Sequence, residues 1–289
     1  MRYEGALYRP PSESQSMLIQ MTVGCSYNKC TYCAMYQDVD FRVKSIEDVL
    51  ADIEEAATYR FKRVFLCDGD ALIAPQDFLV KVLSHIKMHM PFVDRVGIYG
   101  DCRSILKKTP RQLAQLKELG LGIVYHGIES GDDQTLKKIK KGATAAQIIE
   151  AGKKIREAGL QYSAIVMLGV AGRERSKIHA LESARVLNAI QPDFIGALTT
   201  MVVEGTPIDS LIEKGKFELP SKMGLLEELK ILISNLELEH GLLTTRHASN
   251  YLPLRIVFPY EKSRALAELT EVLENSDETV LKPEWMRGL

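Results

Sequence analysis

The sequence lacks the long apolar runs of a membrane protein and the charge imbalance of a nucleic-acid scaffold. Its longest apolar stretch, residues 164–172, is about nine residues long, whereas a membrane span needs about 18. The first residues lack the apolar stretch of a signal peptide. Lysine and arginine number 37 and aspartate and glutamate 38, so no basic surface is indicated. We expect a cytoplasmic protein with no membrane partner and no nucleic-acid partner.

Cysteine is scarce, but three of the five cysteines lie within nine residues of one another. An odd number in a long chain favours a metal or redox site over a disulfide framework. Cys25, Cys30 and Cys33 have CX4CX2C spacing, and their thiolates suit an iron–sulfur cluster, zinc or copper(I). A structural zinc site normally has a fourth ligand, and none is near in the sequence. His85 and His89 are expected on the outer surface of a helix.

Short apolar runs alternate with helical patterns along the first 200 residues. The runs show no clean alternation of apolar and polar residues, which is typical of strands covered on both faces of a parallel sheet. Six strands are expected, at residues 17–23, 62–67, 95–99, 123–128, 162–168 and 193–201.

Helices fill the intervals between these strands. Ser45, Thr109 and Thr144 each precede an acidic or amide residue by three positions, the pattern of a capping box at a helix start. Successive right-handed βαβ units predict an α/β fold with a parallel sheet, either open and doubly wound or a barrel. Further helices are expected at residues 176–190, 221–239 and 263–273.

Chemically informative residues follow the strands directly. In parallel α/β folds the carboxyl ends of the strands share one ligand-binding face, so we expect these residues to converge there. Cys67, inside a strand, is expected to be a buried small hydrophobe, and Cys102, after the third strand, an inert residue or a substrate-side thiol. The residues that follow the strands include Cys25 to Cys33, Asp68, Gly69, Asp70, Asp101, Glu129, Ser130 and Gly169.

The cysteine loop resembles that of the radical S-adenosylmethionine (radical SAM) superfamily. The usual spacing in that family puts three residues between the first two cysteines, and this chain has four, residues 26–29. Tyr32, the aromatic residue before the last cysteine, does match. Four further segments are similar to motifs of the family in the same order, namely residues 66–71, 127–142, 155–159 and 167–172.

The resemblance implies a partial (β/α)6 TIM-like barrel with parallel strands at residues 17–205. A lead-in at residues 1–16 would precede it, and a C-terminal helical extension with a substrate-side loop would follow at residues 206–289. It also implies a single [4Fe–4S] cluster on the three cysteines, with one iron open to SAM. The implied SAM contacts are Tyr32, Asp68, Gly69, Asp70, Glu129, Ser130, Arg156, Leu168 and Gly169.

The implied activity is that of an enzyme, an oxidoreductase or a lyase. The cluster would reductively cleave SAM to methionine and a 5′-deoxyadenosyl radical, which takes hydrogen from a small-molecule or nucleoside-type substrate. The electron would come from a donor such as flavodoxin or ferredoxin. Two alternatives stay open on the sequence: a non-catalytic iron–sulfur electron carrier or sensor, and a zinc-stabilised binding barrel.

Residues 245–253 carry many polar side chains without helical or strand periodicity. They form either an ordered turn or a loop that closes over substrate. Loops on a rigid scaffold often carry binding residues, so we expect substrate contacts from this segment. The candidates are Arg246, His247, Ser249 and Asn250.

Overall fold

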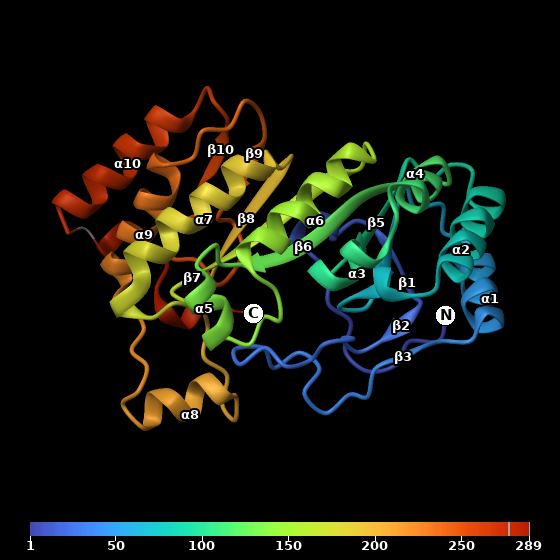
Figure 1. Cartoon of the computed structure of the whole chain (residues 1–289), viewed down its shortest axis with the longest axis horizontal. Helices are drawn as coiled ribbons and strands as arrows, with labels where there is room; N and C mark the ends of the chain where they lie inside the picture. The colour runs from blue at the N-terminus through green and yellow to red at the C-terminus, as the bar shows by residue number, and fades with distance from the viewer. Residues whose placement is uncertain (277, 289) are drawn as a thin grey trace. The chain divides into compact units, whose positions relative to one another are not determined.

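The computed structural model describes residues 1–276 and 278–288, which divide into two compact units (Figure 1). No helix in these described residues is both long enough and apolar enough to cross a lipid bilayer. The first unit comprises Met1–Asn28, Met35–His126 and Glu150–Tyr162, and the second comprises Lys29–Ala34, Gly127–Ile149 and Ser163 onward.

The first unit has strands and helices in alternation. Its strands are β1 (Met17–Gln20), β2 (Thr22–Val23), β3 (Arg42–Val43), β4 (Arg63–Cys67), β5 (Arg95–Tyr99) and most of β6 (Leu121–Glu129). Its helices are α1 (Ile46–Ala57), α2 (Gln76–His89), α3 (Cys102–Lys107), α4 (Pro110–Glu118) and the C-terminal part of α6 (Ala145–Glu157). Short 3₁₀ turns occur at Pro11–Glu13 and Ala71–Ile73.

The second unit continues the alternation and adds a C-terminal extension. Its strands are nearly all of β7 (Gln161–Leu168), with β8 (Phe194–Thr199), β9 (Leu242–Thr244) and β10 (Arg255–Val257). Its helices are α5 (Asp133–Lys138), α7 (Ser176–Ile190), α8 (Pro207–Glu213), α9 (Lys222–Ser234) and α10 (Lys262–Glu274). Short 3₁₀ turns occur at Arg173–Arg175, Glu278–Val280 and Glu284–Met286.

The main sheet is mostly parallel and has the strand order β1-β4-β5-β6-β7-β8-β9-β10. The pairs β1–β4, β4–β5, β5–β6, β7–β8 and β8–β9 are parallel, while β10 is antiparallel to β9. The described strands form an open sheet, with no closed barrel among them. The predicted α/β fold with a parallel sheet is confirmed, and it is consistent with a partial TIM-like barrel.

The helix starts follow the sequence pattern closely. The Ser45 side chain accepts a hydrogen bond from the Asp48 N–H at 3.1 Å. Thr109 and Gln112 form a complete capping box, with bonds of 3.2 and 2.8 Å. Capping satisfies backbone donors that the first helical turn leaves without partners, so these residues fix where each helix begins.

Two sequence predictions need correction. The helix predicted at residues 221–239 ends at Ser234, because the chain turns away while its apolar residues Leu236 and Leu238 stay buried. The apolar pattern therefore extends beyond the helix. The six predicted strands are all present, but β3, β9 and β10 were not predicted, since two or three residues are too few to show a period.

Candidate functional site

The cysteine loop begins in the first unit with Cys25 and continues into the second unit with Cys30 and Cys33. All three side chains are half-buried. No disulfide joins cysteines anywhere in the described part of the chain. Half-buried thiols outside disulfides are the kind that ligate soft metals.

In the first unit, Asp68 directly follows β4 and is buried. Its Oδ2 accepts hydrogen bonds from the Gly24 N–H at 3.1 Å and from Gln20 Nε2 at 3.0 Å. Its Oδ1 is buried and has no hydrogen-bond partner among the described residues. Burial raises the pKa of Asp68 to about 6, against the lowering effect of these two donors. The turn after β4 therefore holds one carboxylate oxygen ready for a donor.

Asp70, two residues further on, has a different environment. Its Oδ1 accepts from the Asp101 N–H at 2.8 Å and from Ser104 Oγ at 2.6 Å, and its Oδ2 accepts from Ser26 Oγ. Burial raises its pKa to about 6, while these donors act to lower it. Both oxygens are occupied, so Asp70 ties the residue after Cys25 to the turn after β5.

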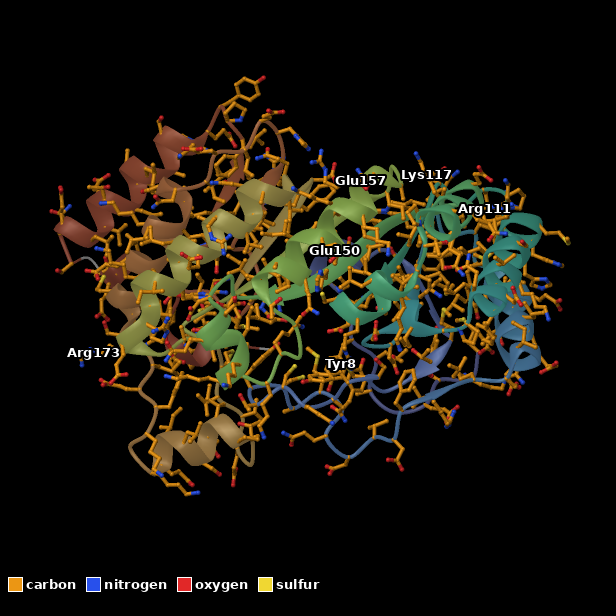
Figure 2. The ribbon with its side chains drawn as sticks, viewed as in Figure 1. Tyr8, Arg111, Lys117, Glu150, Glu157 and Arg173 are labelled. Carbon is orange, nitrogen blue, oxygen red and sulfur yellow. The ribbon has the colours of Figure 1, made fainter. Side chains whose placement is uncertain are left out.

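Gly69 lies where a side chain would not fit. A Cβ there would stand 2.8 Å from Tyr36 Cε2 and 3.2 Å from the Cβ of Cys25. Tyr36 is buried and packs edge-to-face on Tyr8, with ring centroids 5.4 Å apart; Tyr8 is labelled in Figure 2. The glycine thus brings the turn after β4 directly against Cys25, beneath an aromatic cover.

In the second unit, the backbone of Thr31 anchors the other part of the cysteine loop. Its N–H donates to the Ile139 carbonyl at 3.0 Å, and its carbonyl accepts from the Ile208 N–H at 3.1 Å. Thr31 itself is buried. The peptide groups between Cys30 and Cys33 are therefore held by segments that follow α5 and begin α8.

Glu129, the last residue of β6, forms a buried cluster with residues of the loop. The Tyr32 hydroxyl donates to its carboxylate, and burial together with this carboxylate raises the pKa of Tyr32 well above its usual value. Lys141 Nζ lies 3.4 Å from Glu129 Oε1, and both side chains are buried. Glu129 Oε2 has no hydrogen-bond partner among the described residues. A Cβ at Gly127 would stand 2.1 Å from Glu129 Oε1, so a larger residue there would displace this carboxylate.

A second buried network joins Ser130 to Gly169. Ser130 Oγ lies 2.8 Å from His179 Nδ1, and His179 Nε2 lies 3.5 Å from Glu228 Oε1. Glu228 accepts the Gly169 N–H at 2.7 Å and also the Ser176 hydroxyl. Burial lowers the pKa of His179 to about 4 and raises that of Glu228 to about 7. His179 is thus neutral at pH 7, and its contact with Glu228 is no ion pair.

Asp132, in the loop between β6 and α5, forms an ion pair with Arg175. Arg175 donates to both of its carboxylate oxygens at 2.9 Å, and Thr135 adds donors from its backbone and side chain. Burial opposes ionisation, but these bonds prevail and lower the pKa of Asp132 to about 2. The loop after β6 is therefore fixed by a bidentate ion pair.

The family model described as the Radical SAM superfamily matches residues 19–183, more than half of the chain. The chain belongs to the radical SAM superfamily. Members of this superfamily use a [4Fe–4S] cluster and SAM as cofactors. The matched segment contains the cysteine loop and the strand ends described above.

Individual relatives are distant. An uncharacterised protein of Methanocaldococcus jannaschii is 22% identical over 212 residues, which cover 69% of this chain and 65% of the relative. Biotin synthase 1 of Paracoccus denitrificans is 26% identical over 203 residues, covering 68% and 60%. The solved structure of methylornithine synthase superposes with a TM-score of 0.55 at 17% identity, covering 77% of this chain and 63% of that one. The chain spans less than two thirds of each of these proteins.

The arginine expected to meet the SAM carboxylate lies on α6. Arg156 is half-buried, one residue after the buried Ile155. Figure 2 labels Glu150 and Glu157 on the same helix. The assignment of Arg156 to SAM stays a prediction from the radical SAM motif at residues 155–159.

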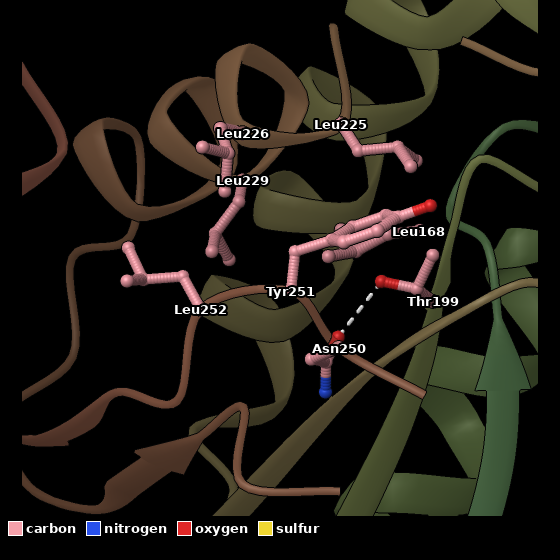
Figure 3. Close-up of a pocket in the computed structure, with 8 residues that line it drawn as sticks. All are labelled: Leu168, Thr199, Leu225, Leu226, Leu229, Asn250, Tyr251 and Leu252. Atoms are coloured by element: carbon pink, nitrogen blue, oxygen red, sulfur yellow. Dashed lines mark hydrogen bonds between the residues drawn. The ribbon is translucent and has the colours of Figure 1, made fainter. Parts of the chain in front are cut away.

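The segment expected to contact substrate is tied to β8. Ser249 Oγ accepts a hydrogen bond from the Thr199 N–H at 3.1 Å. Asn250 Oδ1 accepts from Thr199 Oγ1, and Asn250 Nδ2 donates to the Ala197 carbonyl, both at 2.8 Å. Figure 3 shows the Asn250–Thr199 bond at the edge of a narrow apolar pocket, which Leu168 also lines. Arg246 and His247 make no such bonds to the strand in the described structure, and Arg246 is exposed.

Several residues of the site escaped the sequence analysis. Lys141 lies in a lysine run, a pattern typical of a solvated surface, yet it is buried. His179 and Glu228 lie at buried positions of amphipathic helices, where a polar residue among apolar neighbours is the one available signal. Arg175 precedes a helix and has no distinguishing motif.

The carboxylates at the two strand ends fit the cofactor of the family. Asp68 Oδ1 and Glu129 Oε2 are buried acceptors without partners among the described residues. A buried acceptor without a donor is costly, so such an atom in a native protein calls for a bound group. SAM carries an ammonium and ribose hydroxyls that can donate, and the cysteine thiolates suit iron.

Proposed function

We propose that this chain is a radical SAM enzyme in which Cys25, Cys30 and Cys33 hold a [4Fe–4S] cluster. The observation that carries the proposal is this trio of half-buried cysteines within the segment that matches the family. Three cysteines leave one iron of a four-iron cluster for SAM. When bound, the cluster supplies the electron for reductive cleavage of SAM.

The chain's own residues would bind and orient SAM. Asp68 Oδ1 accepts from the ammonium, since its other oxygen is already used by Gly24 and Gln20. Glu129 Oε2 accepts from the ribose hydroxyls, while Lys141 and Tyr32 hold the rest of that carboxylate in place. Each acceptor restrains the group of SAM that donates to it.

The remaining contacts would position the backbone and the carboxylate of SAM. Gly69 and Asp70 shape the turn against Cys25, and Ser130, Leu168 and Gly169 provide the wall beside the adenine. The His179–Glu228 network supports this wall by binding Ser130 and the Gly169 N–H. Arg156 is assigned to the SAM carboxylate, which a guanidinium binds well.

The substrate is proposed to be a small molecule or a nucleoside-type compound. Arg246 and His247 would face it, while Ser249 and Asn250 hold the segment against β8. The electron is proposed to come from a flavodoxin or ferredoxin in a reducing, cytoplasmic compartment.

The test is anaerobic incubation of the iron-reconstituted protein with SAM and dithionite. We expect release of 5′-deoxyadenosine and methionine, with no release above background from Cys30→Ala. Cys67→Ala is the matched control, because Cys67 is buried within β4 and should leave the cluster absorbance intact. A protein that binds the cluster but releases no 5′-deoxyadenosine would be a carrier or sensor, and full zinc occupancy without iron would indicate a zinc-stabilised barrel. Either result contradicts the proposal.

A further inference from the structure

A second group of metal-ligating side chains lies on the outer face of the first unit. Helices α1 and α2 pack side by side there (Figure 1). Glu54 comes from α1, and His85 and His89 come from α2, one helical turn apart. One ligand atom from each of the three lies within 4.8 Å of the other two. The sequence separates Glu54 from these histidines by about 30 residues, so only the packing of the two helices reveals the cluster.

The geometry is close to that of a metal site. His85 Nε2 lies 3.1 Å from Glu54 Oε1, and the two imidazole rings lie with centroids 4.1 Å apart and planes inclined by 35°. Ligand atoms around a tetrahedral zinc ion are about 3.3 Å apart, since each bond is about 2.0–2.1 Å. Small side-chain rotations would bring the third ligand atom within this distance.

The surroundings favour a cation. His89 is the last residue of α2 and His85 lies one turn before it, near the carbonyl end of the helix dipole, which attracts positive charge. The side chain of His85 is 17% exposed, so packing restrains its ring, while His89 and Glu54 are exposed and open to an ion from solvent. Two imidazoles and a carboxylate suit zinc and other first-row transition metals better than magnesium or calcium.

We propose that Glu54, His85 and His89 form a binding site for a divalent transition metal, with Zn2+ as the preferred ion, that links α1 to α2. The three protein ligands leave one position for water. The site uses none of the residues assigned to the cluster or to SAM, so it is independent of the proposed function.

The test is a Zn2+ titration of the full chain with its iron–sulfur cluster assembled, followed under anaerobic conditions by calorimetry. We expect one equivalent of Zn2+ to bind without loss of cluster absorbance. The zinc X-ray absorption spectrum should contain nitrogen and oxygen neighbours and no sulfur neighbour. His89→Ala and Glu54→Gln should each weaken binding at least about tenfold.

His240→Ala is the matched control, because the His240 side chain is 44% exposed and has a carboxylate, Asp193, at 4.0 Å but no second histidine in the group. It should bind Zn2+ as the wild type does. Equal affinity in His89→Ala and the wild type would overturn the proposal, and so would sulfur neighbours in the spectrum. If no cluster assembles, the same titration on a variant with Cys25, Cys30 and Cys33 changed to serine still decides the question.

Discussion

The turn after β4 and the segment after β6 both end a parallel strand with buried carboxylates, but they stabilise these carboxylates differently. Asp68 and Asp70 are held mainly by neutral donors, and burial raises the pKa of each to about 6. Glu129 and Asp132 each have a cation in contact, and the pKa of Asp132 falls to about 2. The turn after β4 therefore changes its charge near neutral pH, whereas the loop fixed by Asp132 keeps its charge.

The largest expected effect comes from removing the cation beside Glu129. Lys141→Met leaves a buried carboxylate without its ion-pair partner, so the free energy of unfolding should fall by about 3–5 kcal/mol. The double variant Lys141→Met/Glu129→Gln should recover most of this loss. Urea unfolding at pH 7 measures both. Lys138→Met, at an exposed position of the same lysine run, should stay within about 0.5 kcal/mol of the wild type. An equal loss in that control would remove the distinction between the two regions.

Glu228 is a third buried carboxylate held by neutral donors, the Gly169 N–H and the Ser176 hydroxyl. Its folded-state pKa of about 7 lies above its ordinary value of 4.5, so the native protein keeps a proton that the unfolded chain releases. Stability conferred by that proton is lost as the pH rises from about 4.5 through 7. Glu228→Gln keeps a neutral side chain, so it should gain about 3 kcal/mol relative to the wild type between pH 4 and pH 8.

The measurement is the difference in free energy of unfolding between Glu228→Gln and the wild type across this pH range. His179 acts in the opposite direction. Burial lowers its pKa from 6.5 to about 4, so the stability conferred by its neutral form is lost as the pH falls from about 6.5 to 4. Since His179 contacts Glu228, the comparison is made above about pH 6.5, where His179 is neutral in both the folded and the unfolded state and the change in the difference reports Glu228. A difference that does not change with pH would show that Glu228 is ionised throughout.

The smallest expected effect concerns Asp68 and SAM affinity. Asp68 should bind the SAM ammonium best when ionised, so affinity should fall as the pH drops through about 6. Asp68→Asn should weaken SAM binding about tenfold at pH 7.5 and remove this pH dependence. Equilibrium binding of SAM without reductant, from pH 5.5 to 8, measures both. A variant with unchanged affinity would mean that the free oxygen of Asp68 serves another donor.

Much of the fold could be predicted from the sequence because its signals are local. The apolar runs indicated the positions of all six predicted strands of the main sheet. Ser45 and Thr109 cap their helices as the sequence pattern indicates. The resemblance to the radical SAM family rested on the three-cysteine loop and the order of the motifs, and the family match confirms it although the spacing between the first two cysteines departs from the usual one. The three-residue strands β9 and β10 were missed because so short a segment has no period.

The electrostatics of the site could not be predicted in the same way. Lys141 and Arg175 become partners of Glu129 and Asp132 only through the folded loop after β6. The link from Ser130 through His179 and Glu228 to Gly169 joins four separate segments. Such contacts depend on tertiary packing between residues far apart in the chain, so no local sequence pattern indicates them.

The backbone anchor at Thr31 has a consequence for how the cysteine loop can vary. Its two hydrogen bonds to Ile139 and Ile208 involve peptide groups alone, so they hold whatever side chains the neighbouring positions carry. The additional residue between the first two cysteines lies upstream of this fixed point, in a stretch where Asn28 already adopts a left-handed conformation (φ 49°). An insertion there lengthens the loop between Cys25 and Thr31 and leaves the position of Cys33 relative to Thr31 unaltered.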